Sequence, residues 1–404
     1  ALAAAQGPRP HNSFRVPSSS AEHASDLGRL AHTNVLVMQA PDELAARGQG
    51  RVPAQVGPPV AGLFFETPAS IACLYQLAPL VPGCNPNVVS VNPAGGTGTI
   101  AIVDAFDDPL AERDLRTFDA QFGLQPARLR VVFASGRRPA QDPTGGWELE
   151  ESLDIEWAHA MAPGARIVLV EAASNSFTDL FSAVAVADEL LRDGNGGELS
   201  MSWGGSEFSQ ETLFDVFFTT RKVIYFAATG DAPGVIYPST SPLVVAAGGS
   251  STNRDPFTGA FEIEGAWQSS GGGPSAFELT PPYQQAVAAG LGLVTRATPD
   301  LAFDSDPNTG VYVFDSSPVD GLPAGWFVVG GTSVASPSLA GIVNAAHSGA
   351  SSSVAELAII YAGLGTSNFR DLAYANCGPY GGFPAAPGWD FCTGVGSVLG
   401  LSGK

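Results

Sequence analysis

Short apolar runs rich in β-branched residues alternate with longer Ala- and Leu-rich stretches from about residue 65 onward. Strands of a parallel sheet are buried on both faces and therefore read as continuous apolar runs, with helices between them. We expect an α/β fold in which helices flank both faces of a central, mostly parallel sheet. The expected strands are 99–106, 129–134, 166–172, 199–204, 223–230 and 243–249, and the expected helices are 111–123, 147–162, 177–193, 209–220, 333–348 and 352–364.

The first 64 residues lack this alternation. They are rich in Pro, Ser, Ala and Gly, interrupted by short apolar pieces such as VLVMQA. We expect 1–64 to form an irregular, loosely held N-terminal arm and 65–404 to form one domain. Because the sequence begins ALAAAQG, we also expect a chain end left by cleavage after an Ala-rich signal peptide.

The charge of the chain excludes some classes of function. Of 404 residues, 39 are Asp or Glu and 19 are Lys or Arg, which gives a formal net charge of −20. A nucleic-acid binder needs a basic face, so none is expected here. The sequence has no run of about 18 apolar residues, so we expect no membrane-spanning helix. A mostly neutral, weakly acidic surface suits an extracellular or acidic setting.

Four cysteines permit three pairings. We favour the pairing that closes two short loops, which joins Cys73 to Cys84 and Cys377 to Cys392. There is no CxxC motif and no Cys/His cluster, so zinc is not expected. An even, sparse set of cysteines is typical of an oxidising compartment, and we expect a secreted protein.

The segment GGTSVASPSLAGIVNAA (330–346) contains a candidate nucleophile. A Gly-Gly turn brings Ser333 to the start of an apolar helix, with Pro337 expected in the first turn. The positive end of the helix and its free N–H groups suit an acyl-transfer serine, although an ordinary N-cap serine would look similar. The longer string GTSxASPxxAG resembles the nucleophile segment of subtilisin-like peptidases and of the related sedolisins (serine-carboxyl peptidases).

The general base distinguishes these two families. Subtilisins use a histidine within a string like HGTxVAG, and none of the five histidines lies in such a string. His159, in EWAHAMAPGA, is the one candidate, and we interpret it as a structural residue of a helix.

Two carboxylates offer another base. Glu150 and Asp154, in WELEESLDIEWAHAMAPGA, lie four residues apart and therefore on one face of a helix. Coupled carboxylates have split pKa values, so one can act as a base while the other anchors it. A solvated acidic first turn that includes Glu148, Glu151 and Glu156 is the alternative interpretation. The string resembles the Glu–Asp pair of sedolisins.

Asp231 lies in FAATGDAPG (226–234), directly after an expected buried strand. An Asp in such a turn is often only a turn former. The matching sedolisin string, SGDsG, contains an Asp that donates to the oxyanion, and the resemblance implies that role for Asp231. A carboxylic acid donates only when it is protonated, so burial or low pH would have to keep Asp231 neutral.

The resemblance to sedolisins covers about 67–400. It includes TPASIACLYQLAP (67–79), SMSWGG (200–205), 269–284 and 298–315. It implies a subtilisin-like fold, and it places Asp104 and Trp203 where sedolisins keep an outer acid and an aromatic residue that support the catalytic pair. Sedolisins are made with a long prodomain, so the arm before the domain could be a prodomain remnant.

The segment FRDLAYANCGPYGGFPAAPGWDFCTGVGS (369–397) has two acids around a Gly/Pro-rich loop, which suits a hard cation. The resemblance implies one structural Ca²⁺, bound by the side chains of Asp371 and Asp390 and the carbonyls of Leu372, Ala386 and Gly388. A disulfide-tied turn with surface acids is the alternative.

These features together predict a secreted serine-carboxyl endopeptidase that acts on proteins or peptides. Ser333 is the expected nucleophile and Glu150 the expected base, with Asp154 orienting Glu150. The Ser333 N–H and a protonated Asp231 are expected to hold the oxyanion, which predicts an acid optimum.

Two other functions stay open at this point. One is a subtilisin-type peptidase that uses Ser333 with His159 and Asp104, and the other is a non-catalytic, calcium-stabilised binding protein on the same scaffold. Tripeptidyl-exopeptidase activity is also open, and we expect a monomer.

Overall fold

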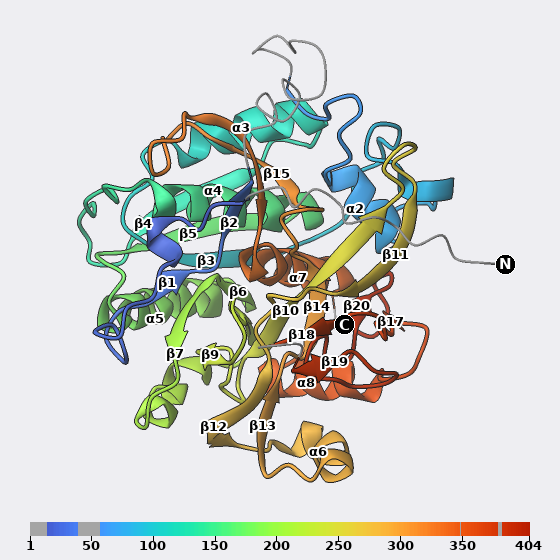
Figure 1. The fold of residues 1–404 in the computed structure, drawn as a ribbon. Coiled ribbons are helices and arrows are strands. Elements are labelled where there is room, and N and C mark those ends of the chain that lie inside the picture. The colour runs from blue at the N-terminus through green and yellow to red at the C-terminus, as the bar shows by residue number, and fades with distance from the viewer. Residues whose placement is uncertain (1–13, 39–56, 348, 379–381) are drawn as a thin grey trace, which may run out of the picture.

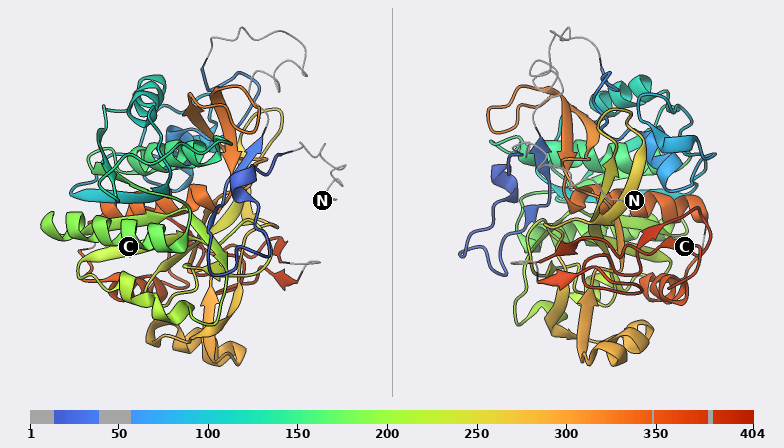
Figure 2. Two further views of the ribbon diagram at one scale, coloured as in Figure 1. Left: turned by 90° about the vertical axis from the view of Figure 1, so that its left-hand side faces the viewer. Right: turned by 45° about the vertical axis from the view of Figure 1, so that its right-hand side comes forward.

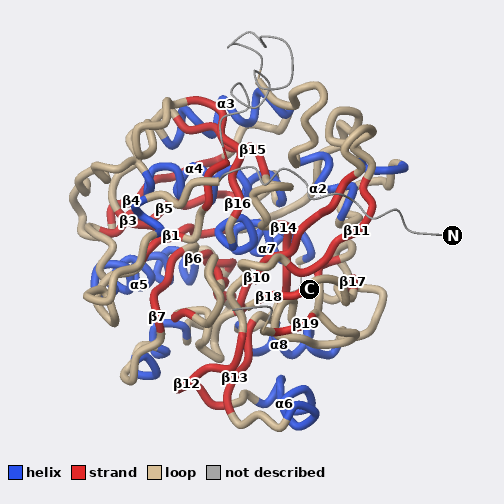
Figure 3. Tube along the Cα trace, viewed as in Figure 1, coloured by secondary structure: helices blue, strands red, loops and turns tan. Residues whose placement is uncertain are grey.

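The computed structural model describes residues 14–38, 57–347, 349–378 and 382–404. A ten-stranded sheet runs through it in the order β17-β20-β14-β10-β8-β6-β3-β5-β4, with β11 paired to β10 (Figures 1 and 3). Neighbours from β20 to β4 are parallel, whereas β17 and β11 are antiparallel to their partners. The expected α/β fold with a mostly parallel sheet is therefore confirmed. The strands are β3 (Thr99–Ala105), β4 (Arg128–Phe133), β5 (Arg166–Ala172), β6 (Gly197–Met201), β8 (Val223–Ala228), β10 (Val245–Arg254), β11 (Phe261–Ala266), β14 (Leu301–Asp304), β17 (Phe369–Arg370) and β20 (Ser397–Val398).

Helices cover both faces of this sheet because its strands are apolar on both sides. In β3, Ile100 and Ile102 join one apolar cluster with residues of α4 and α7, whereas Ala101 and Val103 join another with α5. The helices are α2 (Pro68–Leu74), α3 (Ala111–Phe122), α4 (Gly146–Met161), α5 (Phe177–Asp193), α6 (Gln285–Leu291), α7 (Thr332–Ala346) and α8 (Ser353–Ala362). Adjacent residues of a buried strand thus hold different helices in place.

Most of the expected elements are present within two residues at each end, but three differ. The strand expected at 243–249 is β10, which continues to Arg254. The expected helix at 209–220 is a pair of short 3-10 helices, Glu211–Leu213 and Asp215–Phe218. Phe214 and Phe217, three residues apart, both stack on Phe181 of α5, and side chains at i and i+3 eclipse in 3-10 geometry. The expected strand 199–204 ends at Met201, and a separate strand, β7 (Trp203–Ser206), follows Ser202.

Smaller sheets surround the central one. They contain β12 with β13, β15 with β16, β7 with β9, and β18 with β19. Their bounds are β9 (Ile236–Tyr237), β12 (Gly273–Leu279), β13 (Thr295–Thr298), β15 (Val311–Asp315), β16 (Gly325–Gly330), β18 (Asn376–Cys377) and β19 (Phe383–Pro384). Both favoured disulfides, Cys73–Cys84 and Cys377–Cys392, are present.

The N-terminal segment 14–38 is ordered, in contrast to the loosely held arm that its composition suggests. Strand β1 (His32–Thr33) pairs antiparallel with β7, and β2 (Leu36–Met38) pairs antiparallel with β16. Figure 2 shows this dark blue segment along one side of the molecule. Residues 33–38 are all buried, because two strands of the domain flank them. The rest of the expected arm before residue 57 lies outside the described residues.

A search of the described helices finds none that is long and apolar enough to cross a membrane.

Candidate active site

Ser333 is the second residue of α7, directly beyond the end of β16. Gly331 makes the turn between them with φ 107°, and a Cβ there would lie 2.1 Å from the Asn34 carbonyl oxygen and 2.5 Å from Asp231 Oδ2. Only glycine fits this conformation and this space. The turn therefore delivers Ser333 to the positive end of α7, as the sequence predicts.

We had expected Pro337 in the first turn of α7, but it lies further inside the helix. Proline lacks the N–H that would bond to the carbonyl four residues earlier, which here belongs to Ser333. That carbonyl lies 3.4 Å from the Ser202 hydroxyl oxygen. The proline thus frees a backbone acceptor next to the candidate nucleophile.

Glu150 and Asp154 lie one turn apart on α4, and both are fully buried. The expected alternative of a solvated acidic turn is wrong, because every residue of α4 is buried. Ser202 Oγ donates to Asp154 Oδ1 at 2.7 Å, whereas both oxygens of Glu150 lack a hydrogen-bond partner among the described residues. Burial raises the pKa of both carboxyls well above their usual values, and the charge of Asp104 adds to this effect.

The Ser333 hydroxyl lies among these groups. Its oxygen donates to the Ser202 carbonyl at 3.2 Å and accepts from the backbone N–H of Asn34 at 3.2 Å. It is also close enough to Glu150 to oppose the rise in the pKa of that carboxyl. A turn of the hydroxyl from the Ser202 carbonyl toward Glu150 would connect nucleophile and base.

Asp231 follows β8 and approaches the start of α7. Its Oδ1 accepts from the Thr332 N–H at 2.7 Å and from the Thr332 hydroxyl at 3.0 Å. Its Oδ2 is buried without a partner among the described residues. Burial raises the pKa of Asp231 to about 7, so this carboxyl carries a proton in acid. That proton can serve as a hydrogen-bond donor.

Asp104 is the second-last residue of β3, and it lies near Glu150 and Asp154. Burial raises its pKa to about 8, and its charge raises the pKa of Glu150 and of Asp154. The indole of Trp203 donates to the Val103 carbonyl at 2.7 Å, so it contacts the backbone beside Asp104. The charge of Asp104 thus acts on Glu150 and Asp154, whereas Trp203 contacts the backbone of β3.

His159 lies at the other end of α4. Its Nε2 is 3.3 Å from Asp119 Oδ1 and 2.9 Å from the Gln125 carbonyl oxygen, and the ring is fully buried. These contacts tie α4 to α3 and the loop after it. They fit the structural role expected for His159 and do not favour the subtilisin-type alternative.

Two site residues, Ser202 and Asn34, were not singled out by sequence reasoning. Ser202 lies in the recognised string SMSWGG, and the break between β6 and β7 exposes its hydroxyl and carbonyl to the site. Asn34 precedes Ser333 by 299 residues, and no local pattern in the sequence marks it.

In the candidate calcium loop, each expected acid accepts a hydrogen bond from the backbone of another expected ligand residue. Asp371 Oδ2 accepts from the Gly388 N–H at 2.9 Å, and Asp390 Oδ2 accepts from the Ala386 N–H at 2.9 Å. No group of three or more His, Cys, Asp or Glu side chains in the described residues could hold a metal ion. A site here would therefore depend on backbone carbonyls such as that of Leu372, whose oxygen suits Ca²⁺.

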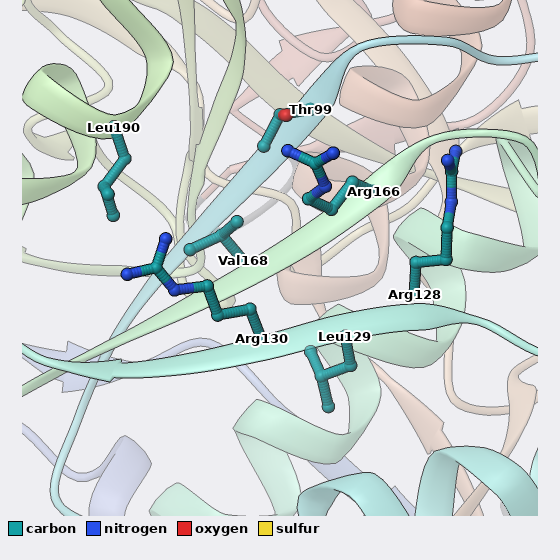
Figure 4. A pocket seen from close by; sticks show the side chains of 7 residues that line it. All are labelled: Thr99, Arg128, Leu129, Arg130, Arg166, Val168 and Leu190. Carbon is teal, nitrogen blue, oxygen red and sulfur yellow. The ribbon is translucent and has the colours of Figure 1, made fainter. Parts of the chain in front are cut away.

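Two cavities lie at opposite edges of the sheet. One of about 290 Å³ is lined by Asp231, Asn34 and His32, and it lies at the carboxyl ends of the parallel strands. The other, of about 350 Å³, lies at the amino ends of β3, β4 and β5 and is lined by Arg128, Arg130 and Arg166 (Figure 4). Ligands of open α/β sheets bind outside the carboxyl ends of the strands, which favours the first cavity as the site.

This arrangement defines a subtilisin-like α/β fold with a serine that faces carboxylates. The solved Pseudomonas sedolisin complexed with two molecules of pseudo-iodotyrostatin aligns at TM-score 0.66 with 23% identity, over 83% of this chain and 95% of that chain. A solved structure named sphericase aligns at TM-score 0.52 with 16% identity, over 83% and 99%. At these identities the similarity establishes the fold.

Sequence comparison finds two relatives. Kumamolisin from Bacillus sp. (strain MN-32) is 29% identical over 403 residues, and sedolisin from Pseudomonas sp. (strain 101) is 32% identical over 348 residues. These matches cover 90% and 76% of this chain, and the chain spans 65% and 57% of the length of those two relatives. The chain is therefore similar to two sedolisin-type proteins over most of its own length. No family model matches the sequence.

Proposed function

We propose that this chain is a serine-carboxyl endopeptidase that hydrolyses peptide bonds in acid. The observation that carries the proposal is that Ser333 and Asp231 border one backbone carbonyl, that of Asn34, while the buried carboxyls of Glu150 and Asp154 lie next to Ser333 and Ser202 respectively. The Ser333 N–H donates to this carbonyl oxygen at 3.1 Å, and the unpartnered Asp231 Oδ2 lies beside it. The carbonyl thus occupies the place where an oxyanion would form.

The mechanism follows from these positions. Ser333 Oγ attacks the substrate carbonyl carbon while Glu150, in its ionised form, accepts the serine proton. The nearby Ser333 hydroxyl favours this form, because it opposes the rise in the pKa of Glu150 that burial causes. Asp154, held by Ser202, keeps Glu150 oriented and shares its negative charge. The Ser333 N–H and protonated Asp231 hold the oxyanion, and such preorganised donors are usually the largest part of catalysis. Glu150 then passes the proton to the leaving amine.

The proposal includes one structural Ca²⁺ in the loop that Cys377–Cys392 closes. When bound, the ion would supply a fixed positive charge between the carboxylates of Asp371 and Asp390. The hydrogen bonds of these two side chains to Gly388 and Ala386 support the site, because they hold carboxylates and carbonyl-bearing backbone in one loop. We also propose a secreted monomer, for which the two disulfides are the supporting observation.

The test is the pH–rate profile for cleavage of a denatured protein from pH 2 to 9, with Ser333→Ala as the blank. We expect an acid optimum in the native chain and no cleavage in the blank. Labelling of Ser333 by a peptide aldehyde, which forms a hemiacetal with an active serine, is a second readout. Absence of both turnover and labelling would refute the proposal and favour a non-catalytic binding protein.

A further inference from the structure

The cavity at the amino ends of β3, β4 and β5 has no part in the proposed peptidase site, which lies at the opposite edge of the sheet. Its volume is about 350 Å³, and the seven residues that line it include three arginines and no acid (Figure 4). The arginines are Arg128, Arg130 and Arg166. In a chain with 19 basic and 39 acidic residues, three positive charges around one cavity reverse the sign of the charge locally. Such a place attracts anions.

The register of the strands brings these arginines together. Arg128 of β4 is the Cα partner of Arg166 of β5, and Arg166 is also the partner of Thr99 of β3. Arg130 follows Arg128 by two positions, and residues two apart on a strand lie on the same face of the sheet. Val168, two positions after Arg166, is buried on this face in the apolar cluster that contains residues of α5. The arginines therefore stand where the apolar contact with α5 ends.

Their charges have no acidic partner within the molecule. All three side chains are exposed, and none forms an ion pair with an acid of the described residues. Arg254, Arg296 and Arg370, in contrast, each pair with a carboxylate. Arg128 donates to the carbonyl of Gly164, which is a neutral group. Like charges on neighbouring strands destabilise a sheet, and an anion between them would relieve this repulsion.

We propose that this cavity binds a tetrahedral oxyanion, a phosphate or sulfate ester of a small organic group. The terminal oxygens of such an ester can accept from more than one guanidinium group, whereas a single carboxylate is filled by the fork of one arginine. The ester binds between Arg166, whose guanidinium group points toward Thr99, and Arg130, whose guanidinium group points toward Leu190 (Figure 4).

The apolar part of the lining suits the organic group of the ester. Val168 is buried at the floor of the cavity, and Leu190 of α5 forms part of its wall. The volume of the cavity lies in the range of about 300 to 1,000 Å³ that is usual for small-molecule sites. An ester should therefore bind more tightly than the inorganic anion that lacks the organic group. This inference does not depend on the proposed peptidase activity.

The test is isothermal titration calorimetry of the full chain with phenyl phosphate and phenyl sulfate at pH 6. We expect one site per chain, and Arg130→Gln and Arg166→Gln should each raise the Kd about tenfold or more, because each removes a charge-assisted contact. Arg137→Gln is the matched control, since Arg137 is exposed and lies beyond the carboxyl end of β4. It removes the same charge at the opposite edge of the sheet and should leave the Kd unchanged.

Two comparisons identify the ligand chemistry. Binding of both esters would support recognition of the tetrahedral oxyanion that they share, and binding of one would identify phosphate or sulfate as the group that the cavity takes. Phenol, which lacks the anion, should not bind, and inorganic phosphate should bind more weakly than phenyl phosphate. Benzoate that binds as tightly as the esters would overturn the proposal, because a carboxylate would then be sufficient.

Thermal unfolding distinguishes a binding site from a structural cluster. Without ligand, Arg166→Gln should keep or raise the Tm, because it removes repulsion between neighbouring strands. Phenyl phosphate should raise the Tm of the native chain and have little effect on that of the variant. A variant that unfolds at a clearly lower temperature without ligand would show that Arg166 is structural and would overturn the proposal.

The remaining outcomes also decide the matter. An equal rise in Kd in Arg137→Gln would attribute binding to the overall charge of the chain, and the absence of both heat and a Tm shift would exclude the site. Neither readout uses turnover. A chain that cleaves a denatured protein in acid but binds neither ester would overturn this inference and leave the proposed function in place.

Discussion

Ser202 donates a hydrogen bond of 2.7 Å to Asp154, although the two residues belong to different elements, the break after β6 and the middle of α4. The bond occupies one oxygen of Asp154, and the other has no partner among the described residues. Because the same Ser202 accepts from Ser333 through its carbonyl, it joins Ser333, the proposed nucleophile, to Asp154. Ser202 is therefore a positioning residue of the site.

Replacing Ser202 with Ala should lower kcat about tenfold and leave KM nearly unchanged, because the backbone carbonyl remains while Asp154 loses its anchor. The acid limb of the pH profile should shift as well, since the Ser202 hydroxyl lowers the pKa of Asp154. Steady-state kinetics between pH 2 and 7 would measure both. A variant with an unchanged profile would show that Ser202 has a packing role only.

Replacing Glu150 with Gln should reduce kcat by at least about a hundredfold, because a neutral amide cannot accept the serine proton. The fold should persist, since the two side chains have nearly the same shape. Glu156→Gln is the matched control on the same helix: Glu156 Oε2 accepts from the Phe314 N–H, and an amide oxygen can replace it. Thermal unfolding and kcat of both variants would test this, and near-normal turnover in Glu150→Gln would refute the assigned base.

Asp231 should set the alkaline limit of activity. Burial raises its pKa to about 7, so it is protonated and donates below that pH, and it becomes a charged acceptor above it. We expect kcat/KM to fall as pH rises through about 7. In Asp231→Asn the amide donates at every pH, so the fall in kcat/KM should move to a higher pH.

Asp188→Asn is the control for this effect. Burial also raises the pKa of Asp188, to about 6, but its carboxyl accepts from Tyr225 and Thr220 outside the site. Its profile should match that of the native chain. An alkaline limb that stays in place in Asp231→Asn would exclude Asp231 as the titrating donor.

The protein should be more stable in weak acid than at neutral pH. Burial raises the pKa of Asp104, Glu198 and Asp315 to about 8 each. The folded chain therefore keeps protons that the unfolded chain releases near pH 4, so the free energy of unfolding decreases as pH rises from about 4 through 8. Scanning calorimetry should give the highest Tm near pH 4 to 5, and Glu198→Gln should weaken the dependence. A maximum of Tm at pH 8 would contradict this prediction.

Calcium should raise the Tm through the loop of Asp371 and Asp390. An ion that binds only the folded state stabilises it by about 2.7 kcal/mol at a hundred times its Kd. A chelator should remove this gain, and Asp371→Asn should reduce it. Asp255→Asn is the control, because Asp255 is only partly buried and also accepts from backbone N–H groups. Equal calcium responses in both variants would place the ion elsewhere.

Much of the fold could be predicted from local patterns. The apolar runs at 99–106 and 166–172 are strands because each buries both of its faces, and 147–162 is a helix although no residue of it is exposed. The prediction of one helix over 209–220 was wrong, because stacking of Phe214 and Phe217 on Phe181 prevailed over helix propensity. Pro337 was misplaced by one turn, since the start of α7 depends on Gly331.

The sequence by itself determined the chemistry that is local. A spacing of four positions from Glu150 to Asp154 puts two carboxylates on one helix face, and the glycines before Ser333 put a hydroxyl at a helix start. Only the tertiary structure decided that Asp154 meets Ser202, that Asp231 reaches Thr332, and that Asn34 crosses Ser333. These contacts join residues 48, 101 and 299 positions apart, and no periodic pattern encodes such distances. The physical reason is that the parallel sheet brings the carboxyl ends of distant strands to one edge, where burial, and not sequence, raises the pKa values that the mechanism needs.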